Sequence, residues 1–173
     1  MTEPLTIDHD RTVVLIMDFQ QRIINTVASE PENVVKQAAQ VLQGARNAGI
    51  PVIYVVHRGG LFAEYTPDVE LHEGVAPAPG EMVITKIRPG PFSTTNLDVT
   101  LRKMGRDTLV VMGVATSGCV LSCVRWAVDV NYKFIVVADA CSDADPEVHR
   151  VLTEKVYPRH GTVISTQEFL NAI

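Results

Sequence analysis

The residue in this chain that is best placed to do chemistry is Cys119. It follows a strand-like apolar run, 109–113, and a short turn of small residues, and it stands where a helix-like apolar stretch begins. A thiol at a helix N-terminus lies near unpaired N–H groups and the positive end of the peptide dipoles. Both favour the thiolate, which is the nucleophilic form of cysteine. We therefore expect Cys119 to be a catalytic nucleophile, with a buried structural cysteine as the alternative.

Two ionisable side chains mark the ends of other strand-like runs. Asp18 interrupts the apolar run 12–19, and Lys86 closes the run 82–86. Taken one at a time, Asp18 fits a turn or cap residue, and Lys86 fits a surface lysine whose stem lies on apolar surface. In an open parallel sheet, however, ligands bind outside the carboxyl ends of the strands. The joint pattern therefore predicts that a carboxylate, an ammonium and a thiol meet at one site.

The composition excludes several classes of protein and indicates the cellular compartment. The 173 residues, 46% of them hydrophobic, predict one domain over 1–173 with one core. The net charge of -5 and the scattered basic residues argue against a nucleic-acid surface. No apolar run approaches the roughly 20 residues of a membrane helix, and the first eleven residues lack the basic stretch and apolar core of a secretory signal, so we expect neither segment. Three cysteines, an odd number, do not make a disulfide framework, so we expect a reducing cytoplasm.

Strand-like and helix-like patterns alternate along the chain, which is typical of an α/β domain with a parallel sheet. Right-handed crossovers then predict an open, doubly wound, mainly parallel six-stranded sheet with helices on both faces. Residues 57–80 are rich in glycine and proline, and we expect a long loop that acts as a lid or contacts another subunit. The strands are expected at 12–19, 51–56, 82–86, 108–113, 133–139 and 161–165, and the helices at 33–48, 95–104, 119–130, 146–156 and 166–173.

Three motifs of the chain belong together: Val13-Val-Leu-Ile-Met-Asp-Phe-Gln20, then Thr85-Lys86 before Phe92 and Leu97, and then Gly113-Val-Ala-Thr-Ser-Gly-Cys-Val120. With these motifs the chain resembles, from residue 12 to about residue 165, the isochorismatase-like cysteine hydrolases, which include nicotinamidases and N-carbamoylsarcosine amidases. The resemblance implies the isochorismatase-like fold, an Asp–Lys–Cys triad at Asp18, Lys86 and Cys119, and a cis peptide bond between Val114 and Ala115.

The resemblance also implies a reaction. Asp18 takes the thiol proton, Lys86 stabilises negative charge, and the Cys119 thiolate attacks a carbonyl carbon to form a thioester. The oxyanion rests on the N–H groups of Ala115 and Cys119. The substrate is a small carboxamide or a related amide, no cofactor takes part, and the protein is a homo-oligomer, either a dimer or a tetramer. The candidate substrate-binding residues adjoin the triad in sequence and are Phe19, Gln20, Phe92 and Thr116.

The chain departs from the pattern of this family at two places, and two alternative functions remain open. Gly90-Pro-Phe92 stands where many relatives have Ser-Ala-Phe. Nicotinamidases hold a metal with an Asp and two closely spaced His, whereas His57 and His72 lie far apart without matching acids, so we expect no metal. One alternative function is an isochorismatase-type vinyl-ether hydrolase with Asp18 as general acid. The other is a non-catalytic oligomeric binding protein of the same fold.

Overall fold

The structure, a computed structural model, describes residues 5–173. At its centre lies a six-stranded sheet in which all strands run parallel, in the spatial order β3-β2-β1-β4-β5-β6. The chain winds first from β1 to β3 and then from β4 to β6, which confirms the predicted open, doubly wound sheet. The strands are β1 (Thr12–Met17), β2 (Val52–His57), β3 (Met82–Lys86), β4 (Thr108–Val114), β5 (Lys133–Ser142) and β6 (Thr162–Ile164).

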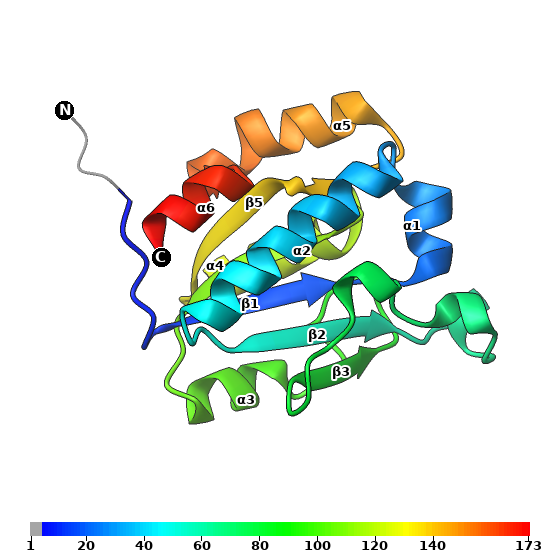
Figure 1. The fold of residues 1–173 in the computed structure, drawn as a ribbon, viewed down its shortest axis with the longest axis horizontal. Coiled ribbons are helices and arrows are strands. Elements are labelled where there is room, and N and C mark those ends of the chain that lie inside the picture. The colour runs from blue at the N-terminus through cyan, green and yellow to red at the C-terminus, as the bar shows by residue number, and fades with distance from the viewer. Residues whose placement is uncertain (1–4) are drawn as a thin grey trace.

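Helices cover both faces of this sheet. They are α1 (Gln21–Val27), α2 (Pro31–Asn47), α3 (Leu97–Lys103), α4 (Leu121–Asp129), α5 (Pro146–Val151) and α6 (Thr166–Ala172). In Figure 1, α2 and α6 lie side by side in front of the sheet, and α4 lies behind it. None of the helices within residues 5–173 is long and apolar enough to cross a membrane.

The apolar patterns of the sequence account for these layers. Every residue of β1 is buried, because parallel strands that are covered on both faces have near-continuous apolar runs. Helix α2 begins with Pro31, whose fixed φ suits a first helical position, and it buries one apolar stripe against the sheet. That stripe consists of Val34, Val35, Ala38, Val41, Leu42 and Ala45.

The predicted helices differ from the structure at three points. Helix α1 was not expected. The helix expected at 119–130 begins three residues earlier, with a π-helical turn at Thr116–Val120 that leads into α4. The helix expected at 146–156 is α5 followed by a second π-helical turn, Leu152–Val156. A π turn closes i→i+5 hydrogen bonds and so holds one more residue than an α turn, which a 3.6-residue periodicity does not reveal.

The segment 58–81, which joins β2 to β3, contains short 3-10 turns and one bridge residue, Leu71, which pairs with Gln20. Two of its apolar side chains are strongly exposed, Leu61 at 87% and Tyr65 at 72%. Within the same segment Val69 and Val75 are buried. The segment is therefore anchored to the core at its later part and open to solvent at its tip.

Candidate active site

Asp18 is the first residue after β1, and its backbone adopts an unusual conformation. Its φ is 60°, in the left-handed region, which Asp tolerates better than most residues. The backbone N–H of Asp18 still donates to the carbonyl of Val55 on β2, at 2.9 Å. The chain thus turns sharply at the carboxyl end of the sheet while it remains bonded to the neighbouring strand.

Lys86 ends the edge strand β3, which β2 separates from β1. Its ammonium nevertheless donates to Oδ2 of Asp18 at 2.7 Å and to the carbonyl of Arg88 at 3.2 Å. The residue is 1% exposed, so it is not a surface lysine. Its long side chain is used to carry a positive charge across one strand into the interior.

Cys119 lies in the π-helical turn that follows β4, and its side chain is turned back toward the end of β1. Its Sγ is 3.6 Å from the carbonyl oxygen of Ala115 and 4.0 Å from that of Met17, the residue before Asp18. The peptide bond between Val114 and Ala115 is cis. The thiol therefore lies in the space between the ends of β1 and β4.

Gly113 makes room for this thiol, and the sequence prediction missed its role. A Cβ at position 113 would lie 2.9 Å from Sγ of Cys119 and 3.1 Å from the carbonyl oxygen of Met17. A glycine inside a strand often marks a close approach of this kind, which is the signal that was available in the sequence.

The protonation states follow from burial. Burial raises the pKa of Asp18 to about 6, while the Lys86 ammonium and the neighbouring Cys119 thiol pull it back down. Burial, together with the charge on Asp18, raises the pKa of the Cys119 thiol well above its ordinary value. The expected resting thiolate is therefore wrong. The helix does not begin at Cys119, and desolvation outweighs any favourable dipole. At neutral pH a carboxylate base faces a protonated thiol.

One atom at this site is left ready to accept a proton. Oδ2 of Asp18 binds Lys86, whereas Oδ1 is buried and has no hydrogen-bond donor among residues 5–173. Asp18, Lys86 and Cys119 are 6%, 1% and 2% exposed, so the three groups meet in an enclosed space with little water. Such surroundings strengthen every charge interaction between them.

The predicted substrate-binding residues are all buried, and three of them have other partners. The Gln20 amide donates to the carbonyls of His57 and Val69 and accepts from the His57 N–H, so it ties β2 to the segment 58–81. Phe92 stacks on Trp126 with ring centroids 6.5 Å apart. Thr116, three positions before Cys119, is bonded to His149 and Tyr157, and Phe19 is fully buried directly after Asp18.

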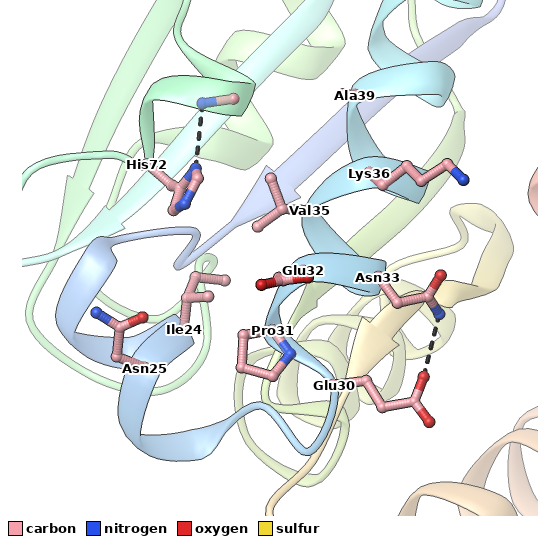
Figure 2. A pocket seen from close by; sticks show the side chains of 11 residues that line it. Ile24, Asn25, Glu30, Pro31, Glu32, Asn33, Val35, Lys36, Ala39 and His72 are labelled. Carbon is pink, nitrogen blue, oxygen red and sulfur yellow. Dashed lines mark hydrogen bonds between the residues drawn. The ribbon is translucent and has the colours of Figure 1, made fainter.

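A large cavity lies away from the triad. It has a volume of about 950 Å³ and lies between α1, the start of α2 and the turn at His72 (Figure 2). Nδ1 of His72 accepts from the Gly74 N–H, which gives this imidazole a role in the turn. Within residues 5–173, no three or more His, Cys, Asp or Glu side chains are grouped so that they could hold a metal ion.

The part of the chain that contains this site matches a known protein family. The family model described as the isochorismatase domain matches residues 12–168, a span that contains all three triad residues. The chain belongs to the isochorismatase family. The isochorismatase family protein YddQ of Bacillus subtilis is 32% identical, over 94% of this chain and 92% of YddQ.

Two further relatives of this isochorismatase family hydrolase have names that state a chemistry. The ureidoacrylate amidohydrolase RutB of Methylobacterium radiotolerans is 29% identical, over 99% of this chain and 83% of RutB. The crystal structure of a cysteine hydrolase from Pseudomonas syringae pv. phaseolicola superposes with a TM-score of 0.87 at 26% identity, over 99% of this chain and 98% of that one. Both of these names describe hydrolases.

Proposed function

We propose that this isochorismatase family protein hydrolyses a C–N bond in a small carboxamide or ureide through a thioester on Cys119. The observation that carries the proposal is the buried ion pair between Lys86 Nζ and Asp18 Oδ2, 2.7 Å long, beside a buried thiol. Burying two charges is costly, and structural stability alone is a weak reason to keep them. The names of the amidohydrolase and cysteine hydrolase relatives point in the same direction.

In the first half of the proposed reaction, Sγ of Cys119 attacks the carbonyl carbon while Oδ1 of Asp18 takes the thiol proton. Lys86 keeps Oδ2 neutralised and fixes the orientation of the carboxyl group. The negative charge that develops on the carbonyl oxygen is accepted by the N–H groups of Ala115 and Cys119, and one such donor is worth about 2.7–4 kcal/mol in other enzymes. The C–N bond then breaks as Asp18 returns its proton to the nitrogen, which leaves as ammonia or an amine.

In the second half, water hydrolyses the thioester. Asp18, again a carboxylate, takes a proton from the water as its oxygen attacks the acyl carbon. The C–S bond breaks, the acid product leaves, and the proton returns to sulfur. The enclosed position of the three groups limits this step to water that enters with the substrate or after the amine has left.

Cys119→Ala tests the proposal directly. We expect the wild type to release ammonia from at least one of ureidoacrylate, N-carbamoylsarcosine and nicotinamide, and Cys119→Ala to release none above background. Cys123→Ala, which removes a neighbouring buried thiol, is the matched control and should retain turnover. A Cys119→Ala variant with full ammonia release would overturn the thioester route.

A second function has one observation in its favour. Because burial raises the pKa of Asp18 to about 6, part of this carboxyl group is protonated near neutral pH and could protonate a vinyl ether. The measurement that separates the two is cleavage of isochorismate. Vinyl-ether chemistry survives Cys119→Ala and is lost in Asp18→Asn, whereas amide hydrolysis is lost in both.

We also propose that the protein is a homo-oligomer that acts on a small molecule. The strongly exposed side chains of Leu61 and Tyr65 support a contact at the tip of the segment 58–81. Sedimentation of the wild type and of Leu61→Ser at equal concentration tests it. A wild type that sediments as a monomer at micromolar concentration would refute the oligomer.

A further inference from the structure

The turn that carries the nucleophile, residues 115–119, is bonded to side chains from a distant part of the chain. The hydroxyl of Thr116 lies 2.8 Å from Nδ1 of His149 on α5. The carbonyl of Thr116 accepts from the hydroxyl of Tyr157 at 2.7 Å. The N–H of Ser117 donates to Oδ2 of Asp143, just after β5, at 2.7 Å. These bonds span between 26 and 41 positions of sequence.

A local irregularity of the helix makes this arrangement possible. His149 and Tyr157 are eight positions apart, and in an uninterrupted α-helix two such side chains point in directions about 80° apart. Seven positions would return to nearly the same face. The π-helical turn Leu152–Val156 supplies the extra residue, so both side chains reach Thr116. π turns of this kind occur frequently at functional sites.

Burial fixes the proton states of two of the groups. Tyr157 is fully buried, and burial raises the pKa of its hydroxyl, so the hydroxyl keeps its proton and donates to Thr116. Burial also lowers the pKa of His149, against the opposing charge of Asp143, so the imidazole is neutral at physiological pH. The bonds to Thr116 are therefore made between neutral groups and do not weaken through loss of a charge near neutral pH.

The position of these bonds within the turn is what links them to catalysis. Thr116 and Ser117 lie between Ala115 and Cys119, the two residues whose N–H groups accept the oxyanion in the proposed reaction. The carbonyl of Ala115 is already engaged by the N–H groups of Gly118 and Val120, at 3.1 and 3.3 Å. Rotation of the peptide after Thr116 would consequently move the oxyanion donors and the thiol relative to Asp18.

We infer that Asp143, His149 and Tyr157 are positioning residues that hold the nucleophile turn in its reactive geometry. Among residues 5–173 no hydrogen bond joins them to the three triad side chains, and their bonds to this turn are made to Thr116 and Ser117. Their expected effect on kcat rests on the proposed function, whereas their expected effect on the reactivity of the Cys119 thiol does not. The experiments below separate these two dependences.

The first experiment removes single hydrogen bonds and measures steady-state hydrolysis of the best amide of the panel. Tyr157→Phe keeps the ring and removes the hydroxyl, and His149→Leu removes the imidazole. We expect each to lower kcat about three- to tenfold, the range for one lost hydrogen bond, with KM within about twofold. His149→Asn, whose amide group can take the place of Nδ1, should restore most of the rate. Unchanged kcat in both variants overturns the inference.

The second experiment needs no substrate. Iodoacetamide labelling at pH 7, read by mass spectrometry, compares Cys119 with Cys123 and Cys141. In Tyr157→Phe we expect labelling of Cys119 to slow by about three- to tenfold, for one hydrogen bond, while the other two thiols are unaffected. Acceleration at all three thiols would show a loosened fold instead and would overturn the inference. If the wild type hydrolyses no amide, the proposed function fails, but this result still decides on positioning.

A double-mutant cycle tests whether His149 acts through Thr116. Thr116→Val removes the hydroxyl at nearly constant volume, and it is combined with His149→Leu. If the imidazole acts through that hydroxyl, the double variant labels Cys119 no more slowly than the slower single variant. If the two fold-reductions in the labelling rate multiply in the double variant, His149 acts by another route and is not a positioning residue for this turn.

Discussion

Two segments border the triad at the carboxyl edge of the sheet, and they are held in opposite ways. The nucleophile turn, 115–119, is held by hydrogen bonds to Asp143, His149 and Tyr157, of which the bond from Tyr157 is buried and the other two are partly buried. The segment 58–70 is tied down instead by ion pairs near the surface. Arg22 bonds to Asp68 at 2.7 Å and Arg58 bonds to Glu70 at 3.0 Å, with the acidic partners about half exposed.

This difference indicates which segment beside the site keeps a fixed geometry and which segment is free to move. A buried hydrogen bond is costly to break because the abandoned groups remain away from water. An exposed ion pair is screened by solvent and contributes little, about 0–1 kcal/mol. We expect the nucleophile turn to keep one geometry while the segment 58–70 opens and closes beside it. The predictions below test this contrast, from the largest expected effect to the smallest.

Lys86→Met should have the largest effect. It leaves the buried Asp18 carboxyl without its partner, and removing one member of a buried pair costs about 3–5 kcal/mol. We expect the free energy of unfolding at pH 7 to fall by that amount, measured by urea denaturation. The double variant Asp18→Asn/Lys86→Met should recover much of the loss, because no buried charge is then left.

Arg58→Met is the matched control for that experiment, since it breaks an ion pair at the surface, together with the hydrogen bond of Arg58 to the carbonyl of Val69, which Gln20 also donates to. Its free energy of unfolding should change by less than about 1 kcal/mol. Equal losses in Lys86→Met and Arg58→Met would mean that burial does not distinguish the two pairs, and the contrast between the two segments would fail.

Gly113→Ala comes next and tests the packing behind the nucleophile. The new Cβ would lie 2.9 Å from Sγ of Cys119 and 3.1 Å from Cγ2 of Val120, so the thiol must shift. Overpacking of this kind costs about 1–3 kcal/mol of stability, and a displacement of about 1 Å in a reacting atom can cost a hundredfold in rate. Thermal unfolding and amide hydrolysis measure the two effects.

Gly118→Ala, in the same turn, provides the comparison for stability. A Cβ at position 118 would meet only the Cβ of Ala115, at 3.7 Å, which is ordinary contact. Its free energy of unfolding should stay within about 1 kcal/mol of the wild type, the usual range for a substitution without a clash. A loss as large as that of Gly113→Ala would assign the cost to the turn itself and not to the thiol.

The sequence allowed the sheet and the meeting of the three triad side chains to be predicted, for a simple physical reason. Buried parallel strands have near-continuous apolar runs, and Asp18 stands where the fully buried run of β1 stops. Lys86 ends the apolar run of the edge strand β3, which is only partly buried. Parallel strands end at a common edge, so the polar residues that end them come close together. Their catalytic roles remain predictions.

Other features depend on tertiary contacts that no short pattern contains. The bond between Thr116 and His149 joins residues 33 positions apart. The π turn that aligns His149 with Tyr157 adds a single residue between the short helix α5 and the 3-10 turn that begins at Tyr157. The protonation of Cys119 was mispredicted because local dipoles can be read from a sequence, whereas the depth of burial cannot. Helix α1 was missed because its seven residues are too few for a helical apolar periodicity to repeat.

The pH dependence of the reaction tests the base. Because burial raises the pKa of Asp18 to about 6, we expect kcat/KM for the amide to be flat above pH 7 and to fall about tenfold per pH unit well below 6. The raised pKa also affects stability. The stabilisation that follows from this raised pKa is fully present below pH 3.8, the ordinary pKa of the Asp carboxyl group, and it is lost as the pH rises through about 6.

Asp18→Asn isolates that stability effect, because it lacks the titrating group and keeps the other carboxylates. The free energy of unfolding of the wild type minus that of Asp18→Asn should rise as the pH is lowered from 7 to 4. A difference that stays constant over this range would show that Asp18 titrates at its ordinary pKa, and the proposed base would lose its main support.

The smallest effect is expected for Arg22→Met, which removes the hydrogen bonds of the guanidinium group to Asp68, Thr66 and the carbonyl of Leu61. The free energy of unfolding should fall by no more than about 1 kcal/mol, and by less in 0.5 M salt, because exposed ion pairs are screened. Hydrogen exchange should nevertheless quicken in the segment 58–70 and stay unchanged in the nucleophile turn. If exchange quickened in both, the two segments would open together, and the turn would owe its rigidity to the surface ion pairs as well as to the interior bonds.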